Sequence, residues 1–333
     1  MAPLNDVGVP DGGWIDVPVC ETVLTKELKF LVCIDGSDES LAALDYLADD
    51  VLLRDRTATV EALHIYNDEK VGLPHKFRKD FLESRVDGKL ASSVSAKRYK
   101  LSWRRKTGSC AMTINERIVD FHPAFVCMGF TGRKGRKDTA MVASNVWDVM
   151  RAGKCSAIIF KDCSVDELPI RRITRFVVSV SLNTASTKAF LDALRLSKPG
   201  DEIHVVYVKG YMENVGEDSD YTQRLRDKYH NFFDGLQDGS QEIFKRFHDR
   251  QVEFHFISKK RSETTPQAVV RYADGIDADF LVIGFNPLEK IKTPLGCVSM
   301  QIAMETERNI VVSTWIDVDP RIYDDHVRPV SRS

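Results

Sequence analysis

The segment AFVCMGFTGRKGRKDTAMVASN, residues 124–145, has the pattern that decides the fold: a short apolar strand, a glycine-rich basic loop and a helix beginning near Val142. Gly129, Gly132 and Gly135 permit a tight turn and close approach of a ligand to the backbone. A loop that leads into a helix N-terminus exposes N–H groups that can bind phosphate. Four cations follow within the loop: Arg133, Lys134, Arg136 and Lys137. A solvated surface turn has the same composition, so the rest of the chain must decide.

Length and composition exclude several classes of protein. The chain has 333 residues, enough for two ordinary domains, with 43% hydrophobic and 29% charged residues, as in globular proteins. A net charge of −2 gives no bulk attraction to nucleic acid or to an anionic membrane. We find no apolar run long enough to span a bilayer and no secretory or mitochondrial leader, so we expect a cytoplasmic protein without membrane or nucleic-acid partners.

The seven cysteines are scattered without the CxxC spacing of a metal or redox motif. Cys33, Cys127 and Cys155 lie in or beside apolar runs, where a thiol packs as a small hydrophobe. An odd number of isolated thiols indicates a reducing compartment. We therefore expect neither a disulfide framework nor a metal site.

Apolar runs and helical patterns alternate along the whole chain. This alternation predicts parallel sheets built from right-handed crossovers, that is, an α/β protein. The predicted strands are 30–35, 59–66, 97–104, 125–128, 155–161, 176–180, 202–208, 252–257, 280–284 and 310–313. Helical patterns cover 39–53, 74–94, 109–121, 142–152, 184–196, 220–248, 265–275 and part of 285–304.

The order of elements repeats once. FLVCIDGSDESLAALDYL at 30–47 aligns with FVVSVSLNTASTKAFLDA at 176–193, and FVCMG at 125–129 aligns with FLVIG at 280–284. A repeat of this length indicates duplicated domains rather than a solenoid. The expected organisation is an N-terminal arm (1–28), a first domain (29–162), a linker (163–175), a second domain (176–315) and a C-terminal tail (316–333).

These motifs together resemble the universal stress protein family in its tandem, two-domain form. The resemblance rests on strand–Asp–Gly–Ser–helix at 30–40 and on strand–Gly–x–x–Gly–loop–Ser–helix at 125–146, and it extends over both halves. It implies two tandem, open, five-stranded parallel sheets flanked by helices, the nucleotide alpha-hydrolase-like fold. It also implies that the last strands, 157–160 and 310–312, join as a pseudo-dimer of the two halves or as a homodimer.

In nucleotide-binding members of this family, an Asp that closes the first strand contacts adenine, and a G-x2-G-x9-G-[ST] loop holds the ribose and phosphates. The resemblance therefore implies that Asp35, with the adjoining Gly36, lies at the base end of an ATP or AMP site. Mg²⁺ would accompany ATP. At the phosphate end it implies these residues: Gly129, Gly132, Ser144 and Asn145.

The chain departs from the family pattern in both halves. Ten residues separate Gly132 from Ala143, which stands where the family has glycine. In the second half Ser181 replaces the Asp and Pro287 replaces a loop glycine, so we expect no working site there.

Two hypotheses of different classes stand. The first is a stress-response protein that binds adenine nucleotide at one site, in the first domain. The second is an interaction protein that keeps the fold without binding nucleotide, with the arm around Trp14 as a docking segment for a protein partner. An enzyme is disfavoured beyond slow ATP hydrolysis, because the chain has no P-loop, no H-E-x-x-H and no G-x-S-x-G motif.

Overall fold

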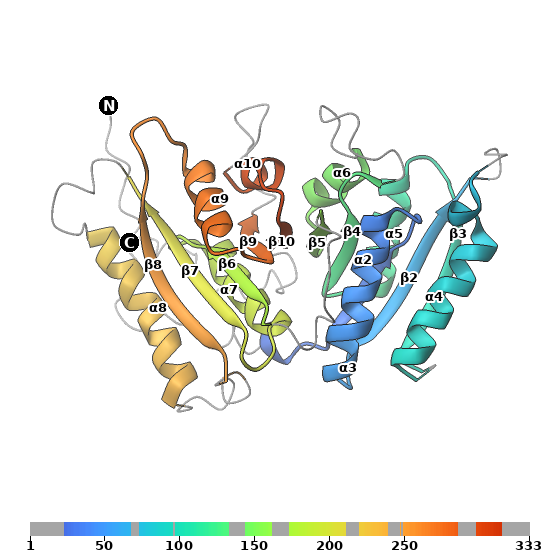
Figure 1. The fold of residues 1–333 in the computed structure, drawn as a ribbon, viewed down its shortest axis with the longest axis horizontal. Helices are drawn as coiled ribbons and strands as arrows, with labels where there is room; N and C mark the ends of the chain where they lie inside the picture. Colours follow the sequence, from blue (N-terminus) through green and yellow to red (C-terminus); the bar gives the residue numbers. More distant parts are fainter. Residues whose placement is uncertain are drawn as a thin grey trace, which may run out of the picture.

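A computed structural model describes residues 23–67, 73–95, 97–132, 144–161, 173–210, 220–238, 247, 249–285 and 298–314. Most of the predicted arm and linker, the tail, and the basic part of the 124–145 segment lie outside these ranges. The described residues form the predicted alternation of strands and helices, arranged as two similar halves side by side (Figure 1).

Ten strands form one continuous sheet in the order β3-β2-β1-β4-β5-β10-β9-β6-β7-β8. Within each half every pairing is parallel, so the two predicted five-stranded parallel sheets are present. All ten predicted strands are confirmed, with small shifts at their ends. The strands are β1 (Lys29–Cys33), β2 (Thr59–Tyr66), β3 (Tyr99–Arg105), β4 (Phe125–Gly129), β5 (Ser156–Phe160), β6 (Arg175–Ser179), β7 (Glu202–Lys209), β8 (Gln251–Ser258), β9 (Phe280–Phe285) and β10 (Asn309–Thr314).

The two halves meet through the last strand of each. β5 and β10 pair antiparallel, with Ile159 opposite Ile310 and Ala157 opposite Val312. This is the intramolecular pairing that the family resemblance implied. Each of these strands has a second neighbour, β4 for β5 and β9 for β10, so the edges of the sheet are β3 and β8.

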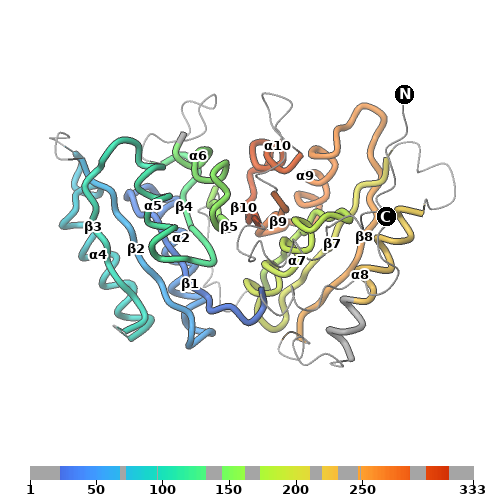
Figure 2. The backbone as a smooth tube through the Cα atoms, turned by 180° about the vertical axis from the view of Figure 1, so that it is seen from behind, coloured from blue at the N-terminus to red at the C-terminus, as the bar shows by residue number. Residues whose placement is uncertain are grey.

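Helices cover both faces of the sheet (Figures 1 and 2). One hydrophobic core lies under α2, α4, α7 and α8, and a second lies under α5, α6, α9 and α10. Both cores extend through the two halves, as expected for parallel strands whose side chains are buried on both faces. The helices are α2 (Asp38–Tyr46), α3 (Leu52–Arg54), α4 (Lys79–Ser93), α5 (Cys110–Phe121), α6 (Ser144–Ala152), α7 (Thr184–Leu196), α8 (Asp220–Asp238), α9 (Thr265–Gly275) and α10 (Val298–Glu305).

The first helix differs from its prediction. The pattern at 39–53 predicts one regular helix, but a π-helical turn, Leu47–Val51, separates α2 from α3. The N–H of Leu52 donates to the carbonyl of Leu47, five residues back. The spacing of hydrophobic residues cannot show such a turn. One extra residue in a single turn rotates the following side chains, but the overall helical pattern remains.

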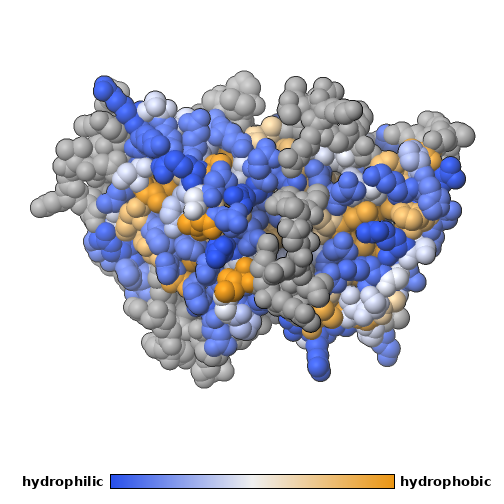
Figure 3. All heavy atoms as spheres, in the orientation of Figure 1, coloured by the Kyte–Doolittle hydropathy of each residue, from blue (hydrophilic) through white to orange (hydrophobic). Residues whose placement is uncertain are grey.

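The described residues on the face drawn in Figure 3 are mostly hydrophilic. In Figure 3 the hydrophobic residues of the visible face form separate patches among polar ones. Exposed large hydrophobic side chains are spread over several elements, including Leu53, Met112 and Ile173. Among the described helices, we find none that is both long and apolar enough to cross a membrane.

Candidate functional site

The predicted site lies where the strand order reverses. β1 has β2 on one side and β4 on the other, so the chain leaves the carboxyl ends of β1 and β4 in opposite directions. The crevice outside such a point is where open α/β sheets bind ligands. β1 ends at Cys33, two residues before Asp35, and β4 ends at Gly129, three residues before Gly132.

Asp35 shapes the turn that enters α2. Its Oδ1 accepts hydrogen bonds from the Ser37 N–H at 2.9 Å and from the Ser37 hydroxyl at 2.6 Å. Gly36 has φ +87°, a conformation that glycine adopts without steric cost. Ser37 then caps the helix, its hydroxyl accepting from the Ser40 N–H. This one turn therefore fixes both the carboxylate and the N-terminus of α2.

The two glycines of the loop have different structural roles. Gly132 has φ +62°, and a Cβ there would lie 3.0 Å from Oδ2 of Asp35. The structure thus places Gly132 beside the carboxylate of Asp35. Gly129 packs against the start of α2, where a Cβ would lie 2.9 Å from the Cβ of Glu39 and 3.0 Å from the Ser40 nitrogen.

Glu39 and Thr131 join the two loops, a contact that the sequence reasoning missed. The Glu39 carboxylate is buried and accepts from the Thr131 N–H at 2.7 Å and from the Thr131 hydroxyl at 2.8 Å. An acid in the first turn of a helix is normally explained by the helix dipole alone. The sequence therefore offered no separate signal that this carboxylate holds the loop after β4.

Negative charges gather around Asp35, whereas positive charges follow Gly132 in the sequence. Three carboxylates, those of Asp35, Asp38 and Glu39, surround the start of α2, so that end disfavours a further anion. Burial, followed by the negative charge of Asp35, raises the pKa of the Cys33 thiol well above its ordinary value and keeps it protonated. An anionic group is better accommodated beyond Gly132, where the cations of 133–137 follow in sequence.

His64 has a packing role. It lies on β2, is buried, and its Nδ1 is 2.6 Å from the carbonyl oxygen of Ile34. Its ring meets the edge of Trp103. These contacts explain why a polar ring is buried on β2.

The remaining predicted residues are only partly described. Ser144 is the first residue of α6, and Asn145 follows it, half-buried. The side chain of Ser144, together with Arg133, Lys134 and Ala143, lies outside the described residues. The neighbourhood of Asp35, Gly36, Gly129 and Gly132 is therefore the part of the predicted site that has a described geometry.

The second half has the same strand-to-helix turn and strand glycine as the first, but Ser181 stands in the place of Asp35. Ser181 follows β6 as Asp35 follows β1, and the Ser186 hydroxyl accepts from the Ser181 N–H at 3.0 Å. Gly284 is the penultimate residue of β9, the strand equivalent to β4, and a Cβ there would lie 2.3 Å from the Ala185 carbonyl carbon. The matching glycines therefore serve the packing of strand against helix, whereas only the first half has an acid at the switch point.

Comparison with known proteins agrees with this architecture. Residues 28–161 match the model of the Universal stress protein family. A search of curated protein sequences finds no relative.

Solved structures share the fold over most of the chain. A universal stress protein from Archaeoglobus fulgidus, 19% identical, superposes with a TM-score of 0.58 over 86% of this chain and 96% of its own. A candidate universal stress protein from Pseudomonas aeruginosa, 14% identical, gives 0.57 over 92% and 99%. The cytoplasmic domain of a prokaryotic cation chloride cotransporter, 11% identical, gives 0.51 over 88% and 98%. Residues 28–161 thus match the universal stress protein family, and the second half repeats the fold of this first half.

Proposed function

We propose that the first half binds an adenine nucleotide, ATP or AMP, at the carboxyl ends of β1 and β4, and that the protein serves a stress response. The observation that carries the proposal is that Gly132 lies beside Asp35 at the switch point of the strand order, where a Cβ on Gly132 would be 3.0 Å from Oδ2 of Asp35. A carboxylate held in place by Ser37 can accept a hydrogen bond from the exocyclic amine of adenine. Gly132 keeps the adjacent backbone open to a ligand.

The nucleotide would lie with its base toward Asp35 and its phosphates toward α6. The carboxylates around α2 repel phosphate, whereas the cations after Gly132 attract it. Ser144 and Asn145, at the N-terminus of α6, are the proposed donors to phosphate. Mg²⁺ would accompany ATP at this end.

Asp35→Asn tests the proposal without disturbing the turn. Asn keeps the Oδ1 that accepts from Ser37, but it presents an NH₂ group in place of the second carboxylate oxygen. Loss of a hydrogen bond to a charged group costs about 1.5–3 kcal/mol, so ATP should bind about tenfold to a hundredfold more weakly. The measurement is isothermal titration calorimetry of the full chain.

Two controls make the result specific. Ser181→Ala changes the equivalent position of the second half and should leave ATP affinity unchanged. GTP should bind the parent protein more weakly than ATP, because guanine presents a carbonyl oxygen where adenine has its amine. Equal affinity for ATP in the parent and Asp35→Asn proteins, or no binding to either, would reject the proposal.

The second candidate function is interaction with a protein partner without nucleotide. Ser181 favours it for the second half, because this residue has a hydroxyl group where the first half has the carboxylate of Asp35. Under this hypothesis the protein as purified carries no adenine nucleotide. Heating the protein and separating the released small molecules by chromatography distinguishes the two functions, since recovered ATP or AMP supports the first.

A further inference from the structure

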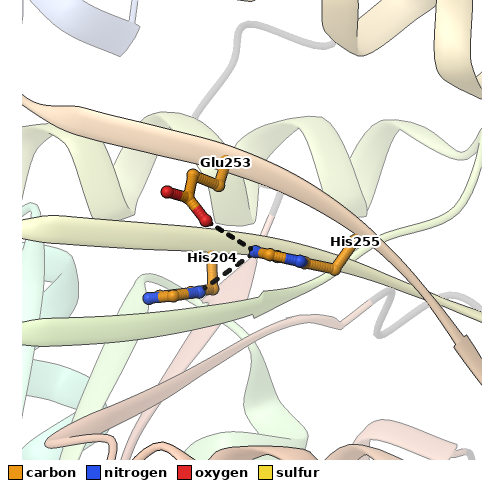
Figure 4. A group of neighbouring side chains, drawn as sticks. All are labelled: His204, Glu253 and His255. Carbon is orange, nitrogen blue, oxygen red and sulfur yellow. Dashed lines mark hydrogen bonds and ion pairs between the residues drawn. The ribbon is translucent and has the colours of Figure 1, made fainter.

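Two histidines and a glutamate gather on neighbouring strands of the second half (Figure 4). His204 is the third residue of β7, and Glu253 is the third residue of β8, directly opposite it. His255 lies two residues after Glu253 and therefore on the same face of the sheet. Figure 4 shows the three side chains pointing toward one another from the two strands.

We propose that His204, Glu253 and His255 bind a divalent transition-metal ion of the Zn²⁺ class. Nδ1 of His204 lies 3.2 Å from Nε2 of His255, which lies 3.2 Å from Oε2 of Glu253. In a tetrahedral zinc site with bonds of about 2.0–2.1 Å, neighbouring ligand atoms are about 3.3–3.4 Å apart. The preformed spacing therefore matches two edges of a zinc tetrahedron.

The same three atoms can be joined by protons or by a metal ion. His204 Nδ1, His255 Nε2 and the carboxylate oxygen of Glu253 are all acceptors when both imidazoles lack a proton at these atoms. Without a metal ion, His255 Nε2–H can donate to Glu253 while the Tyr272 hydroxyl donates to His204 Nδ1. A metal ion between them is bound by all three at once.

The surroundings support coordination through Nδ1 of His204. The other ring nitrogen, Nε2, lies 3.7 Å from Oε2 of Glu202, so it can direct its N–H toward a carboxylate. Metal-binding histidines commonly have such an outer carboxylate, which fixes the ring and raises its basicity.

Tyr272 of α9 stands beside the open coordination position. Its hydroxyl lies 3.2 Å from Nδ1 of His204. It can hydrogen-bond a water molecule on the metal. Two histidines and one carboxylate with an open fourth position are typical of zinc sites that retain water.

The cluster of His204, Glu253 and His255 lies away from the proposed nucleotide site. It lies near the amino ends of β7 and β8, at the sheet edge of the second half, whereas Asp35 follows the carboxyl end of β1 in the first. The Glu253 side chain is 65% exposed and that of His255 is 30% exposed, so an ion can reach them from solvent. The inference is therefore independent of nucleotide binding.

The test is calorimetric titration of the full chain, free of any histidine tag and treated with chelator, with Zn²⁺. We expect one equivalent to bind and to raise the melting temperature, because the ion stabilises the folded state. Glu253→Gln and His255→Ala should each weaken binding by more than the tenfold to hundredfold that loss of an outer carboxylate typically costs. Glu202→Gln should fall within that range. Mg²⁺ should not compete, because imidazole favours transition metals.

The matched control is His230→Ala, which removes an exposed histidine of α8 in the same half and should leave binding unchanged. Circular dichroism of the metal-free variants checks that they fold. Glu253→Gln should disturb folding least, because the Glu253 carboxylate is exposed to solvent. With Co²⁺, histidine and carboxylate ligands give visible bands without the thiolate charge-transfer band of a cysteine site. Unchanged affinity in the double variant His204→Ala/His255→Ala, or a thiolate band, would reject the site.

Discussion

At the scale of single residues, the glycines that the two halves share are explained by packing rather than by ligand binding. Gly129 and Gly284 occupy equivalent places, and a Cβ at either would collide with the helix that follows the first strand of its half. The matching motifs FVCMG and FLVIG therefore record close packing of strand and helix. Gly132 is different, because its φ of +62° and its contact with Asp35 belong to the candidate site.

Substitution of Gly129 tests the packing role. Gly129→Ala should destabilise the protein by about 1–3 kcal/mol, because the added methyl group meets Glu39 and the backbone of α2. Gly88→Ala is the matched control: Gly88 is exposed in α4 with nothing within 4 Å of a Cβ, so alanine should stabilise by about 0.4–1 kcal/mol. Urea unfolding measures both. An unchanged free energy for Gly129→Ala would show that α2 moves freely away from β4.

Glu61 makes stability depend on pH. Its side chain on β2 is fully buried and forms two hydrogen bonds, of 2.6 and 2.5 Å, with Arg117 of α5. Burial alone would raise the pKa of Glu61, but the hydrogen bonds and charge of Arg117 outweigh it and hold the pKa below the ordinary 4.5. The pair therefore contributes stability above pH 4.5, which is lost as pH falls through the lower folded-state pKa.

Glu61→Gln should accordingly cost about 3 kcal/mol at neutral pH, since Arg117 loses its buried carboxylate partner and keeps only the exposed Asp120 at 3.7 Å. The cost should shrink below pH 4.5 and disappear below the lower folded-state pKa, where the folded parent protein loses the same charge. Unfolding free energies measured across the acid range check this. Glu83→Gln, at an exposed position of α4, should give a curve parallel to the parent. A pH-independent cost of Glu61→Gln would contradict the assigned charge effect.

At the scale of elements, α7 and the irregular α2–α3 helix hold the halves together. Arg54, beyond the π-helical turn, donates to the carbonyls of Leu196 and Ser197, where α7 ends. Side-chain donors at a helix C-terminus satisfy carbonyls that lack intrahelical partners. Arg54, which follows the π-helical turn, therefore caps the C-terminus of α7 in the other half.

A buried polar cluster joins α7 to β5. Lys188 and Asp192, both almost fully buried, form an ion pair at 2.7 Å. Ser156 of β5 donates to Asp192 at 2.8 Å and accepts from the N–H of Thr314. This cluster thus connects three elements at the junction of the halves.

Lys188→Met should destabilise the protein by about 3–5 kcal/mol, because it leaves the buried carboxylate of Asp192 without its closest cation. The double variant Lys188→Met/Asp192→Leu should recover most of that loss, since apolar side chains of similar volume need no partner. A double-mutant cycle by urea unfolding measures the coupling. Additive losses would show that the two side chains act separately.

At the scale of the whole molecule, the sheet is continuous through both halves. β5 and β10 close the junction, and Phe280 of β9 contacts Phe160 of β5 and Tyr46 of α2. Both hydrophobic cores contain residues from each half. Separation of the halves would expose these apolar surfaces, so the halves should unfold together.

Scanning calorimetry of the full chain should therefore show one cooperative transition. Ile158→Ala, at a fully buried position opposite Val311, should lower the midpoint of the whole transition through a loss of about 2–5 kcal/mol. Two resolved transitions, with only one shifted by the substitution, would show that the halves unfold independently.

The sequence by itself determined the order of strands and helices, because buried parallel strands read as apolar runs wherever they occur in space. It also predicted that Asp35 follows the first strand and that Gly132 follows the fourth, and each of these strands has a counterpart in the second half. Only the tertiary structure decided which side chains from distant segments meet. The Glu39–Thr131 contact, the capping of α7 by Arg54 and the cluster of His204, Glu253 and His255 all depend on strand register and loop direction. Hydrophobic period carries no information on either, because polar side chains that face one another across a sheet or a loop leave no common pattern in the chain.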